Sequence, residues 1–327
     1  MDSFIYSLNA TIPIFLFMII GNFLKRLGII NRSFCNAADK LVFKVCLPCM
    51  LFLNLTETDI RKNFDMKYVG YCFFVTLFSI LFLWGFAKLL LKDKISVGAF
   101  VQGSYRSSAA ILGIAFIENI YGSSGMAPLM ILGAVPLYNI FAVLILTLES
   151  RRFLEQGEEK NIIERRTVMK KKMKTACIGV VKNPIIIGIF LGLFVSFFRI
   201  PLHPIADKTL SNLGMITSPL ALLSIGASFE GRKAIAKIKP TVLASFFKLI
   251  GLAAVSLPIA IWLGFREQKL LALIIMLASP CTPTAYIMVK NMDGDDVLAS
   301  SIIVMTTFFS SVTLTGWIFF MRLFGYL

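Results

Sequence analysis

The sequence predicts an all-α polytopic membrane protein, with ten transmembrane helices arranged as two inverted repeats of five helices. Three observations lead to this fold class. The 327 residues are 57% hydrophobic and only 16% charged, with a mean hydropathy of +0.81, which is typical of a chain that crosses a membrane several times. Apolar segments long enough to cross a bilayer recur along the whole chain. One long charged stretch, residues 149–176, divides these segments five and five.

Each span is assigned by the requirement for about 20 mostly apolar residues. The first segment lacks the basic start and the small-residue cleavage pattern of a signal peptide, so we expect it to be retained as a helix. Segments 98–118 and 270–290 are the weakest by hydropathy and are assigned partly from their context. The predicted spans are 4–24, 34–56, 67–88, 98–118, 126–148, 177–198, 207–229, 240–263, 270–290 and 297–321.

The basic residues predict the orientation of the spans. Most of the 33 Lys and Arg residues lie in one set of alternate loops, which by the positive-inside rule faces the cytoplasm. This places the charged linker 150–176 in the cytoplasm and both termini outside the cell (plasma) membrane. The same asymmetry accounts for the net charge of +15, so we expect contact with the lipid bilayer and no nucleic-acid partner.

Five spans per half is an odd number, so the second half must enter the membrane with inverted topology, a common plan of secondary transporters. An Ala-Asp-Lys triplet opens the second span at Asp39 and the seventh at Asp207, and a mid-span proline follows each, at Pro48 and Pro219. The predicted domains are a first repeat, 1–149, the linker, 150–176, and a second repeat, 177–327. Both aspartates lie near the predicted helix starts; they are candidates for ion coupling, with stabilisation of the helix start as the alternative.

The spans 98–118 and 270–290 occupy matching places in the two halves, and both carry signs of interruption. Pro280 and Pro283 lie near the middle of the second, where each removes a backbone donor and clashes with the preceding turn. Ser279, Thr282 and Thr284 add hydroxyl groups at the same level. Freed backbone groups at membrane depth are tolerated only beside a cavity or inside protein. Two interrupted helices in corresponding places therefore predict a transporter site; prolines that only kink the helix are the alternative.

Arg106 places a fixed positive charge within the span 98–118, which is rich in Gly, Ser and Ala. Such a charge is expensive at membrane depth and by default marks a functional site. The planar guanidinium suits a carboxylate, and half-helix N-termini add a positive dipole end. The predicted site therefore binds a small organic anion.

Purely structural roles are alternatives for the same polar residues. Arg106 pairs with Glu118 or with a lipid phosphate in one alternative, although direct pairing with Glu118 requires a break between them. In another, the hydroxyls of Ser107 and Ser108 bond back to their own helix. Lys248, within the span 240–263, is structural or snorkels toward an interface in a third.

Cysteine and histidine usage predicts neither a metal site nor a cofactor. The six cysteines are scattered, mostly within apolar spans, and give no disulfide framework. Cys46 and Cys49 share a helix face, but the only histidine, His203, lies far along the chain. We therefore expect these cysteines to be packing thiols.

With these residues in place, the chain resembles the auxin efflux carrier family, the PIN-like transporters, in the form of a bacterial-type member. The similarity extends over essentially the full length and is densest from Lys182 to Phe229. Leu47-Pro48 and Ser279-Pro280 fit the same pattern in the second and ninth spans. The residues that carry the densest part are Asn183-Pro184, Gly188, Gly192, Ile200-Pro201, Pro219-Leu220-Ala221-Leu222-Leu223 and Ile225-Gly226-Ala227.

The resemblance implies a scaffold made of the first, second, sixth and seventh spans. The third, fourth, fifth, eighth, ninth and tenth spans would form a transport domain, in which the fourth and ninth cross at their unwound centres. Family members move organic anions, namely auxin in plants and dicarboxylates such as malate or malonate in some bacteria, by an elevator-type mechanism. The resemblance is also compatible with a homodimer formed on the scaffold side, and the sequence leaves the oligomeric state open.

Combining residues and resemblance, the predicted substrate site lies on the two interrupted spans, with two prolines on the scaffold side. The substrate-binding set is Arg106, Ser107, Ser108, Gly113, Ser279, Pro280, Thr282, Pro283 and Thr284, and the scaffold-side residues are Pro48 and Pro219.

The sequence departs from the family at the interrupted spans. The family's fourth span usually has the pattern Arg-Ser-Asn-x-Gly-Phe-x-Gly-x-Pro. Here Ser108 stands in place of Asn, Ala110 in place of Gly and Ala115 in place of Pro, while Gly113 is kept. In the ninth span, Thr284 stands where Asn is common. Hydroxyls are shorter than amides and offer a different donor set, so the substrate need not be that of other members.

The predicted function is a secondary active or facilitative carrier, driven by a proton or sodium gradient or by the substrate gradient alone. Two further function classes are considered as alternatives. An enzyme would need a nucleophile–base pair, paired acids or a metal motif within the membrane; nearly every acidic residue lies at a span end, so we expect no enzyme. A ligand-binding membrane sensor would use the same anion site and would show saturable binding without flux.

Overall fold

The computed structural model describes residues 2–56, 65–109, 117, 126–149, 182–229 and 231–327, and regular structure within them is helical. The one strand-like feature of these residues is an isolated bridge between Ser107 and Cys281. The all-α prediction is therefore confirmed. The helices of the first half are α1 (Asp2–Arg26), α2 (Arg32–Leu41), the π-helix η1 (Val42–Cys46), α3 (Leu47–Thr56), α4 (Met66–Leu90), α5 (Ile95–Tyr105) and α7 (Ala127–Leu148). Those of the second half are α10 (Pro184–Phe198), α11 (Pro204–Met215), α12 (Thr217–Ser228), α13 (Gly231–Ala236), α14 (Ile238–Phe246), the π-helix η3 (Phe247–Gly251), α15 (Leu252–Trp262), α16 (Glu267–Ala278), α17 (Pro283–Asn291) and α18 (Asp296–Leu323).

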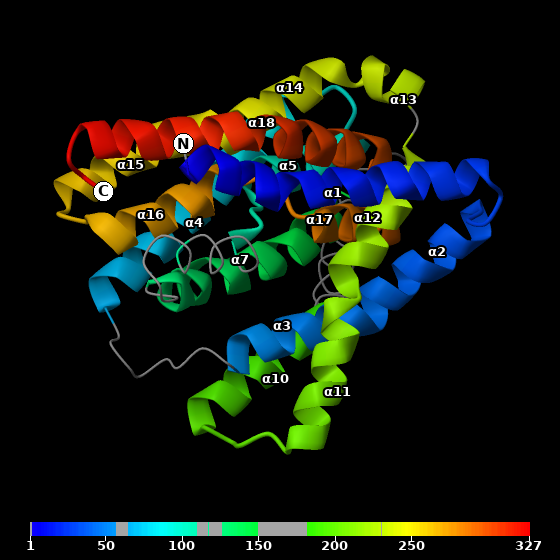
Figure 1. Cartoon of the computed structure of the whole chain (residues 1–327), viewed down its shortest axis with the longest axis horizontal. Coiled ribbons are helices and arrows are strands. Elements are labelled where there is room, and N and C mark those ends of the chain that lie inside the picture. The colour runs from blue at the N-terminus through cyan, green and yellow to red at the C-terminus, as the bar shows by residue number, and fades with distance from the viewer. Residues whose placement is uncertain (1, 57–64, 110–116, 118–125, 150–181, 230) are drawn as a thin grey trace, which may run out of the picture.

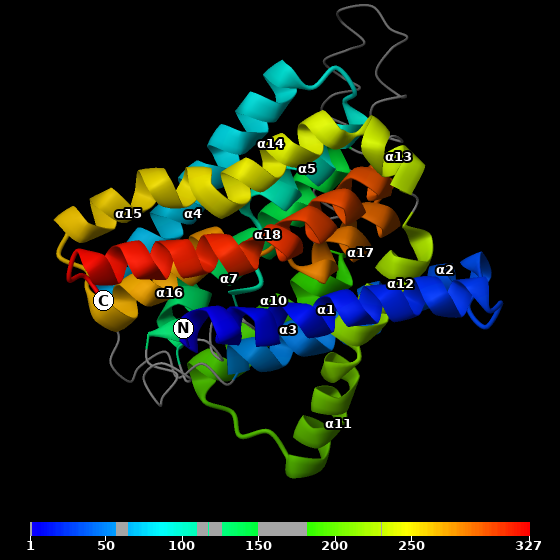
Figure 2. The ribbon, with the colours of Figure 1, turned by 45° about the horizontal axis from the view of Figure 1, so that its top comes forward.

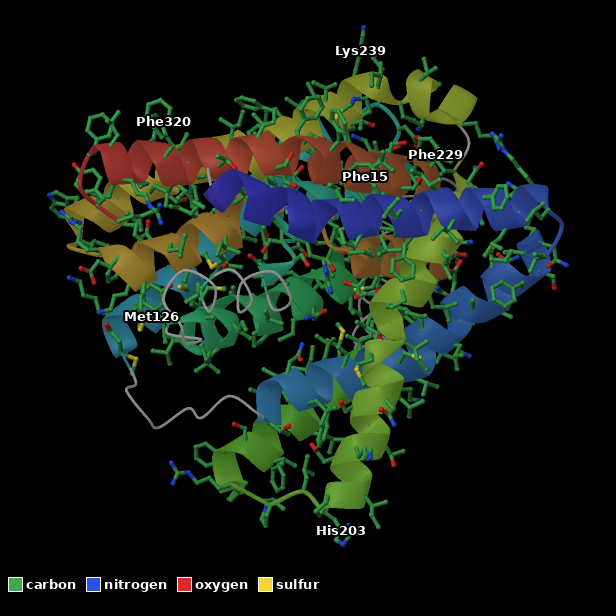
Figure 3. The ribbon with its side chains drawn as sticks, viewed as in Figure 1. Phe15, Met126, His203, Phe229, Lys239 and Phe320 are labelled. Carbon is green, nitrogen blue, oxygen red and sulfur yellow. The ribbon has the colours of Figure 1, made fainter. Side chains whose placement is uncertain are left out.

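Five helical stretches of the described chain are long and apolar enough to cross a membrane: Met66–Leu90, Ala127–Leu148, Pro204–Ser228, Ile238–Trp262 and Asp296–Leu323. Large apolar side chains are exposed along them, such as Phe74 and Phe78 on α4 and Phe320 on α18, the last labelled in Figure 3. Contiguous apolar surface of this kind needs lipid rather than water around it. Most helices begin and end close to the predicted spans, but α5 ends at Tyr105, inside the span 98–118, and the start of the span 177–198 lies outside the described residues. That all ten spans cross the membrane as inverted repeats stays a prediction.

Local sequence signals explain where several helices begin. The Asn183 side chain accepts a hydrogen bond from the backbone N–H of Ile185 at 2.9 Å, and Pro184 takes the first helical position of α10. Proline suits that position because its missing N–H would have no partner there. Asp65 and Asp295 cap α4 and α18 in the same way, accepting from backbone N–H groups three residues on, each at 3.0 Å.

Glycines allow two pairs of helices to touch through their backbones. A Cβ on Gly226 of α12 would lie 1.9 Å from the carbonyl oxygen of Met18 on α1. Cβ atoms on Gly188 and Gly192 of α10 would each lie 2.7 Å from an α3 carbonyl oxygen, of Pro48 and Phe52 respectively. Small residues spaced four apart are a standard means of close packing in membranes, which gives a structural role to the glycines that carry the family resemblance.

The helices pack as two sets that meet along α1, α12 and α17. In the first set, α3 packs against α10 and α11, and α1 against α12. In the second, α4 packs on α5 and α7, while α18 packs on α5, α14, α16 and α17. Figures 1 and 2 show α11 on the opposite side of the molecule from α14, with α1 running beside α18. The helices α5, α16 and α17 are deeply enclosed, since residues 96–105, 270–278 and 283–289 are buried throughout.

Candidate functional site

Two helices end in the middle of the molecule, and their ends meet. The helix α5 ends at Tyr105, and Arg106 takes an extended backbone conformation, with φ −73° and ψ 117°. The helix α16 ends at Ala278, Ser279 is extended, and α17 begins at Pro283. Ser107 and Cys281 form an antiparallel bridge, and the backbone N–H of Ser108 donates to the carbonyl of Pro280 at 3.1 Å. As the two prolines predict, the helical hydrogen bonds of the segment 270–290 are interrupted at its centre.

Arg106 is buried beside these helix ends with neutral partners. Its Nη2 donates to Asn139 Oδ1 at 2.7 Å and to Thr284 Oγ1 at 3.3 Å, and its Nη1 donates to the carbonyl of Tyr138 at 3.4 Å. Its Nε has no hydrogen-bond partner among the described residues. No carboxylate of the described residues forms an ion pair with it. A buried guanidinium without a compensating anion is costly, which is the arrangement expected of an anion-binding site.

A small cavity lies against Arg106, with a volume of about 30 Å³. That volume suits a water molecule and is far smaller than the several hundred Å³ of a typical ligand pocket. An organic acid could enter only if the surrounding helices moved apart. The lining side chains come from α3, the segment that follows α5, α7, the α16–α17 break and the start of α17: Met50, Leu51, Asn54, Arg106, Ser107, Ser108, Val135, Tyr138, Asn139, Thr282 and Thr284.

The structure brings five of the predicted substrate-binding residues to this cavity. They are Arg106, Ser107, Ser108, Thr282 and Thr284. The hydroxyls of Thr282 and Thr284 lie 3.1 Å apart. The Ser107 hydroxyl lies 3.4 Å from the hydroxyl of Tyr138 on α7, a contact with a neighbouring helix rather than with its own.

The other predicted site residues that the structure describes do not line the cavity. Ser279 is buried, with no hydrogen-bond partner for its hydroxyl among the described residues, and Pro280 and Pro283 shape the backbone of the break. Pro48 packs against α10, and Pro219 lies near the start of α12. Gly113 and Glu118 lie outside the described residues, as does the linker 150–176.

Two expectations about charged residues are corrected. Asp39 does not lie at a helix start: Asn31 caps α2, which begins at Arg32, so Asp39 comes in its last turns. There it is buried, and its Oδ2 lies 2.6 Å from Lys290 Nζ on α17. Lys248 does not snorkel to an interface, because it is fully buried and donates to the carbonyl of Leu277 at 2.9 Å. Asp207 lies in the first turn of α11, as predicted.

Sequence reasoning missed the contribution of α7. Tyr138 and Asn139 both line the cavity, and Asn139 also donates through Nδ2 to the Val135 carbonyl at 2.9 Å, which holds its amide oxygen toward Arg106. A mid-span asparagine is itself a signal, since polar side chains are rare in such helices without a partner. Asn139 also supplies an amide close to the positions where Ser108 and Thr284 lack one.

A larger cavity, of about 410 Å³, lies elsewhere, between α1, α12 and α18. Its lining is mainly aromatic and aliphatic, including Phe15 and Phe229, which Figure 3 labels. Arg26 is its only charged lining residue, and that side chain is exposed. Convergent buried polar groups, which orient a ligand, are found at the Arg106 cavity instead.

Comparison with known proteins agrees with a membrane transport role. The family model for membrane transport proteins matches residues 6–318. An uncharacterized transporter from Methanocaldococcus jannaschii is 23% identical over 323 residues, covering 95% of this chain and 98% of that protein. An uncharacterized transporter from Methanothermobacter thermautotrophicus is 22% identical over 319 residues, covering 96% of this chain and 98% of that protein. The chain therefore belongs to the membrane transport protein family, the family of the auxin efflux carriers that its sequence resembles.

Proposed function

We propose that this protein is a secondary active or facilitative transporter of small organic anions, with Arg106 as the residue that binds the carboxylate. The observation that carries the proposal is the buried guanidinium whose partners among the described residues are all neutral, placed at the meeting of two helix ends. A bidentate guanidinium recognises carboxylates specifically. Auxin-like aromatic acids and dicarboxylates such as malate or malonate are the substrate classes to test. The family membership supports transport, and it argues against an enzyme.

The transport cycle we propose is an elevator-type movement of one helix set against the other. The set with α3, α10, α11, α1 and α12 would be the scaffold, and the set with α4, α5, α7 and α14–α18 would carry the anion across. Supporting this, the Arg106 cavity is lined by residues of α3 from the first set and by residues of the second set. The cavity is too small for an organic acid, so movement between the sets is required for entry. The inverted repeats and the crossing of two broken helices belong to the same proposal.

The cellular setting completes the proposal. The protein would lie in the plasma membrane with both termini outside and the linker 150–176 in the cytoplasm, as the distribution of Lys and Arg predicts. A proton or sodium gradient would drive active transport, and a homodimer formed through the scaffold set would hold that set still.

The test is uptake of labelled malate, malonate and an indole carboxylate into proteoliposomes, with and without a pH or sodium gradient. Arg106→Ala should lower saturable uptake at least about tenfold, because a hydrogen bond to a charged group is lost at the binding site. Arg322→Ala is the matched control, since Arg322 lies exposed in the last turn of α18. Uptake that survives in correctly inserted Arg106→Ala protein would overturn the assignment of the site.

A sensor that binds the anion without moving it is the second candidate. The hydroxyls of Ser108 and Thr284, where transporters of this family commonly carry amides, favour it. Equilibrium binding of malonate to the purified protein separates the two: saturable binding that is lost in Arg106→Ala, together with no flux in proteoliposomes, would identify a sensor.

A further inference from the structure

The interruption of α16 leaves two backbone carbonyls without their helical partners. In an α-helix each carbonyl accepts from the N–H four residues on. Pro280 has no N–H, so the Met276 carbonyl loses its partner. The N–H of Cys281 donates instead to Thr306 Oγ1 on α18, at 3.1 Å, so the Leu277 carbonyl loses its partner as well.

Side chains from two other helices donate hydrogen bonds to these two carbonyls in place of the lost backbone N–H groups. The Tyr138 hydroxyl donates to the Met276 carbonyl at 3.3 Å, and Lys248 Nζ donates to the Leu277 carbonyl at 2.9 Å. A buried carbonyl without a donor is strongly unfavourable at membrane depth, where no water replaces the partner. The two contacts therefore stabilise the interrupted form of α16 over alternatives.

Lys248 reaches α16 from an unusual piece of backbone. It lies in the π-helix η3, between α14 and α15, and η3 packs against α16 and α18. A π-helical turn inserts an extra residue and redirects side chains, and such turns are frequent at functional sites. Lys248 is fully buried, and within the described residues its Nζ donates to the Leu277 carbonyl. No carboxylate of the described residues pairs with it.

Burying an ammonium group without a carboxylate is expensive, so simple packing would be served better by Met or Leu. The contact with Leu277 has a direct consequence for the anion site. From Leu277 the chain runs through Pro280, whose carbonyl accepts from Ser108, to Thr284, whose hydroxyl accepts from Arg106. Holding the end of α16 in place therefore also holds the Pro280 carbonyl and the Thr284 hydroxyl in position near the Arg106 guanidinium.

We propose that Lys248 is a positioning residue of the anion site. It acts by holding the C-terminal end of α16 in place through a hydrogen bond to the Leu277 carbonyl. The inference rests on the proposed function of the Arg106 site for its effect on anion affinity, but its effect on the break does not depend on any ligand. The donor group of Lys248 is the part that matters. Arginine keeps a donor of similar reach, whereas methionine keeps length and loses the donor.

Cys281 provides a ligand-free readout, because it lies within the break and is buried. Purified Lys248→Met protein would be treated with N-ethylmaleimide. The rate at which Cys281 is alkylated would be measured by mass spectrometry of the peptide that contains it. We expect the Cys281 rate to rise about tenfold, the factor for loss of a charged hydrogen bond, with Cys72 of α4, which is equally buried, unchanged. Lys248→Arg should restore the wild-type rate. Lys44→Met is the matched control, since Lys44 also lies in a π-helix, η1, but is exposed.

The second readout is the binding of labelled malonate to the same proteins. We expect the affinity for malonate to fall about tenfold in Lys248→Met and to return to the wild-type value in Lys248→Arg. A wild-type Cys281 rate in Lys248→Met overturns the proposal, as does a parallel rise at Cys72 or an equal defect in Lys248→Arg. Where Lys248→Met does not fold, Lys248→Leu, which also lacks a side-chain donor, takes its place under the same criteria. Normal malonate binding in Arg106→Ala overturns the anion site alone and leaves the Cys281 result standing.

Discussion

At the scale of single residues, the proposed anion site depends on the positive charge of Arg106, which has no counter-ion among the described residues. Asn139 is the closest partner of Arg106, at 2.7 Å, and its amide oxygen orients the guanidinium without neutralising it. A carboxylate at the same place would form an ion pair and compete with any anionic ligand. The neutrality of residue 139 is therefore as important to the proposed function as the charge of residue 106.

This distinction gives a prediction for two substitutions at Asn139. Asn139→Asp should abolish malonate binding, because an internal carboxylate occupies the guanidinium, while the protein stays folded. Asn139→Ala removes one hydrogen bond to a charged group, about 1.5–3 kcal/mol, and should weaken binding less. Equilibrium binding and thermal unfolding, measured together, check both. Wild-type affinity in Asn139→Asp would contradict the role given to Arg106.

How far the sequence predicts this site depends on the residue concerned. Arg106 and the Pro280–Pro283 pair are visible from the sequence, because a charge and a lost N–H stand out in an apolar segment. Tyr138 and Asn139 were missed because the span that holds them is strongly apolar and gives no sign of which face meets Arg106. The contact of Lys248 with Leu277 depends on the π-helix η3, and no residue pattern around Lys248 predicts a π-helical turn.

At the scale of helices, the architecture depends on a few places where backbones touch. Hydropathy predicts where the helices lie, and most of the described helices begin and end near those predictions. It does not predict which helices meet. The family-like glycines supply part of that information, because Gly226 brings α12 against Met18 of α1 and Gly188 brings α10 against Pro48 of α3.

Gly226→Ala should therefore destabilise the protein by forcing α1 and α12 apart. The added Cβ would lie 1.9 Å from a backbone oxygen, and overpacking of this kind typically costs about 1–3 kcal/mol. The matched control is Gly316→Ala on α18, where the added Cβ meets nothing within 4 Å and where alanine favours the helix. Thermal unfolding in detergent should show a lower midpoint for the first variant only. Equal midpoints would mean that the α1–α12 contact is not tight in the membrane.

At the scale of the whole molecule, a buried ion pair joins α2, which packs on α12 of the first helix set, to α17 of the second set. Asp39 comes from α2 and Lys290 from α17, with 2.6 Å between Oδ2 and Nζ. Asn291, the next residue, donates to the Asp39 backbone carbonyl at 3.3 Å. In the proposed elevator movement α17 travels with the set that carries Arg106. These contacts must then break in each cycle, and the cavity of about 30 Å³ belongs to a closed state that they help to hold.

A covalent link in place of the ion pair should stop transport. Asp39→Cys/Lys290→Cys protein, with the native cysteines replaced, would be treated with a short bifunctional thiol reagent that a reductant can cleave. Uptake of malonate should be lost on cross-linking and regained on reduction, because the link prevents the sets from separating. Ser96→Cys/Asp295→Cys is the matched control, since the Ser96 hydroxyl and the Asp295 carboxylate lie 2.6 Å apart within one set, and its cross-link should leave uptake intact. In the fully cross-linked Asp39→Cys/Lys290→Cys protein the two helix sets could not move apart. Undiminished uptake by that protein would therefore mean that the anion crosses without movement between the sets, as through a channel.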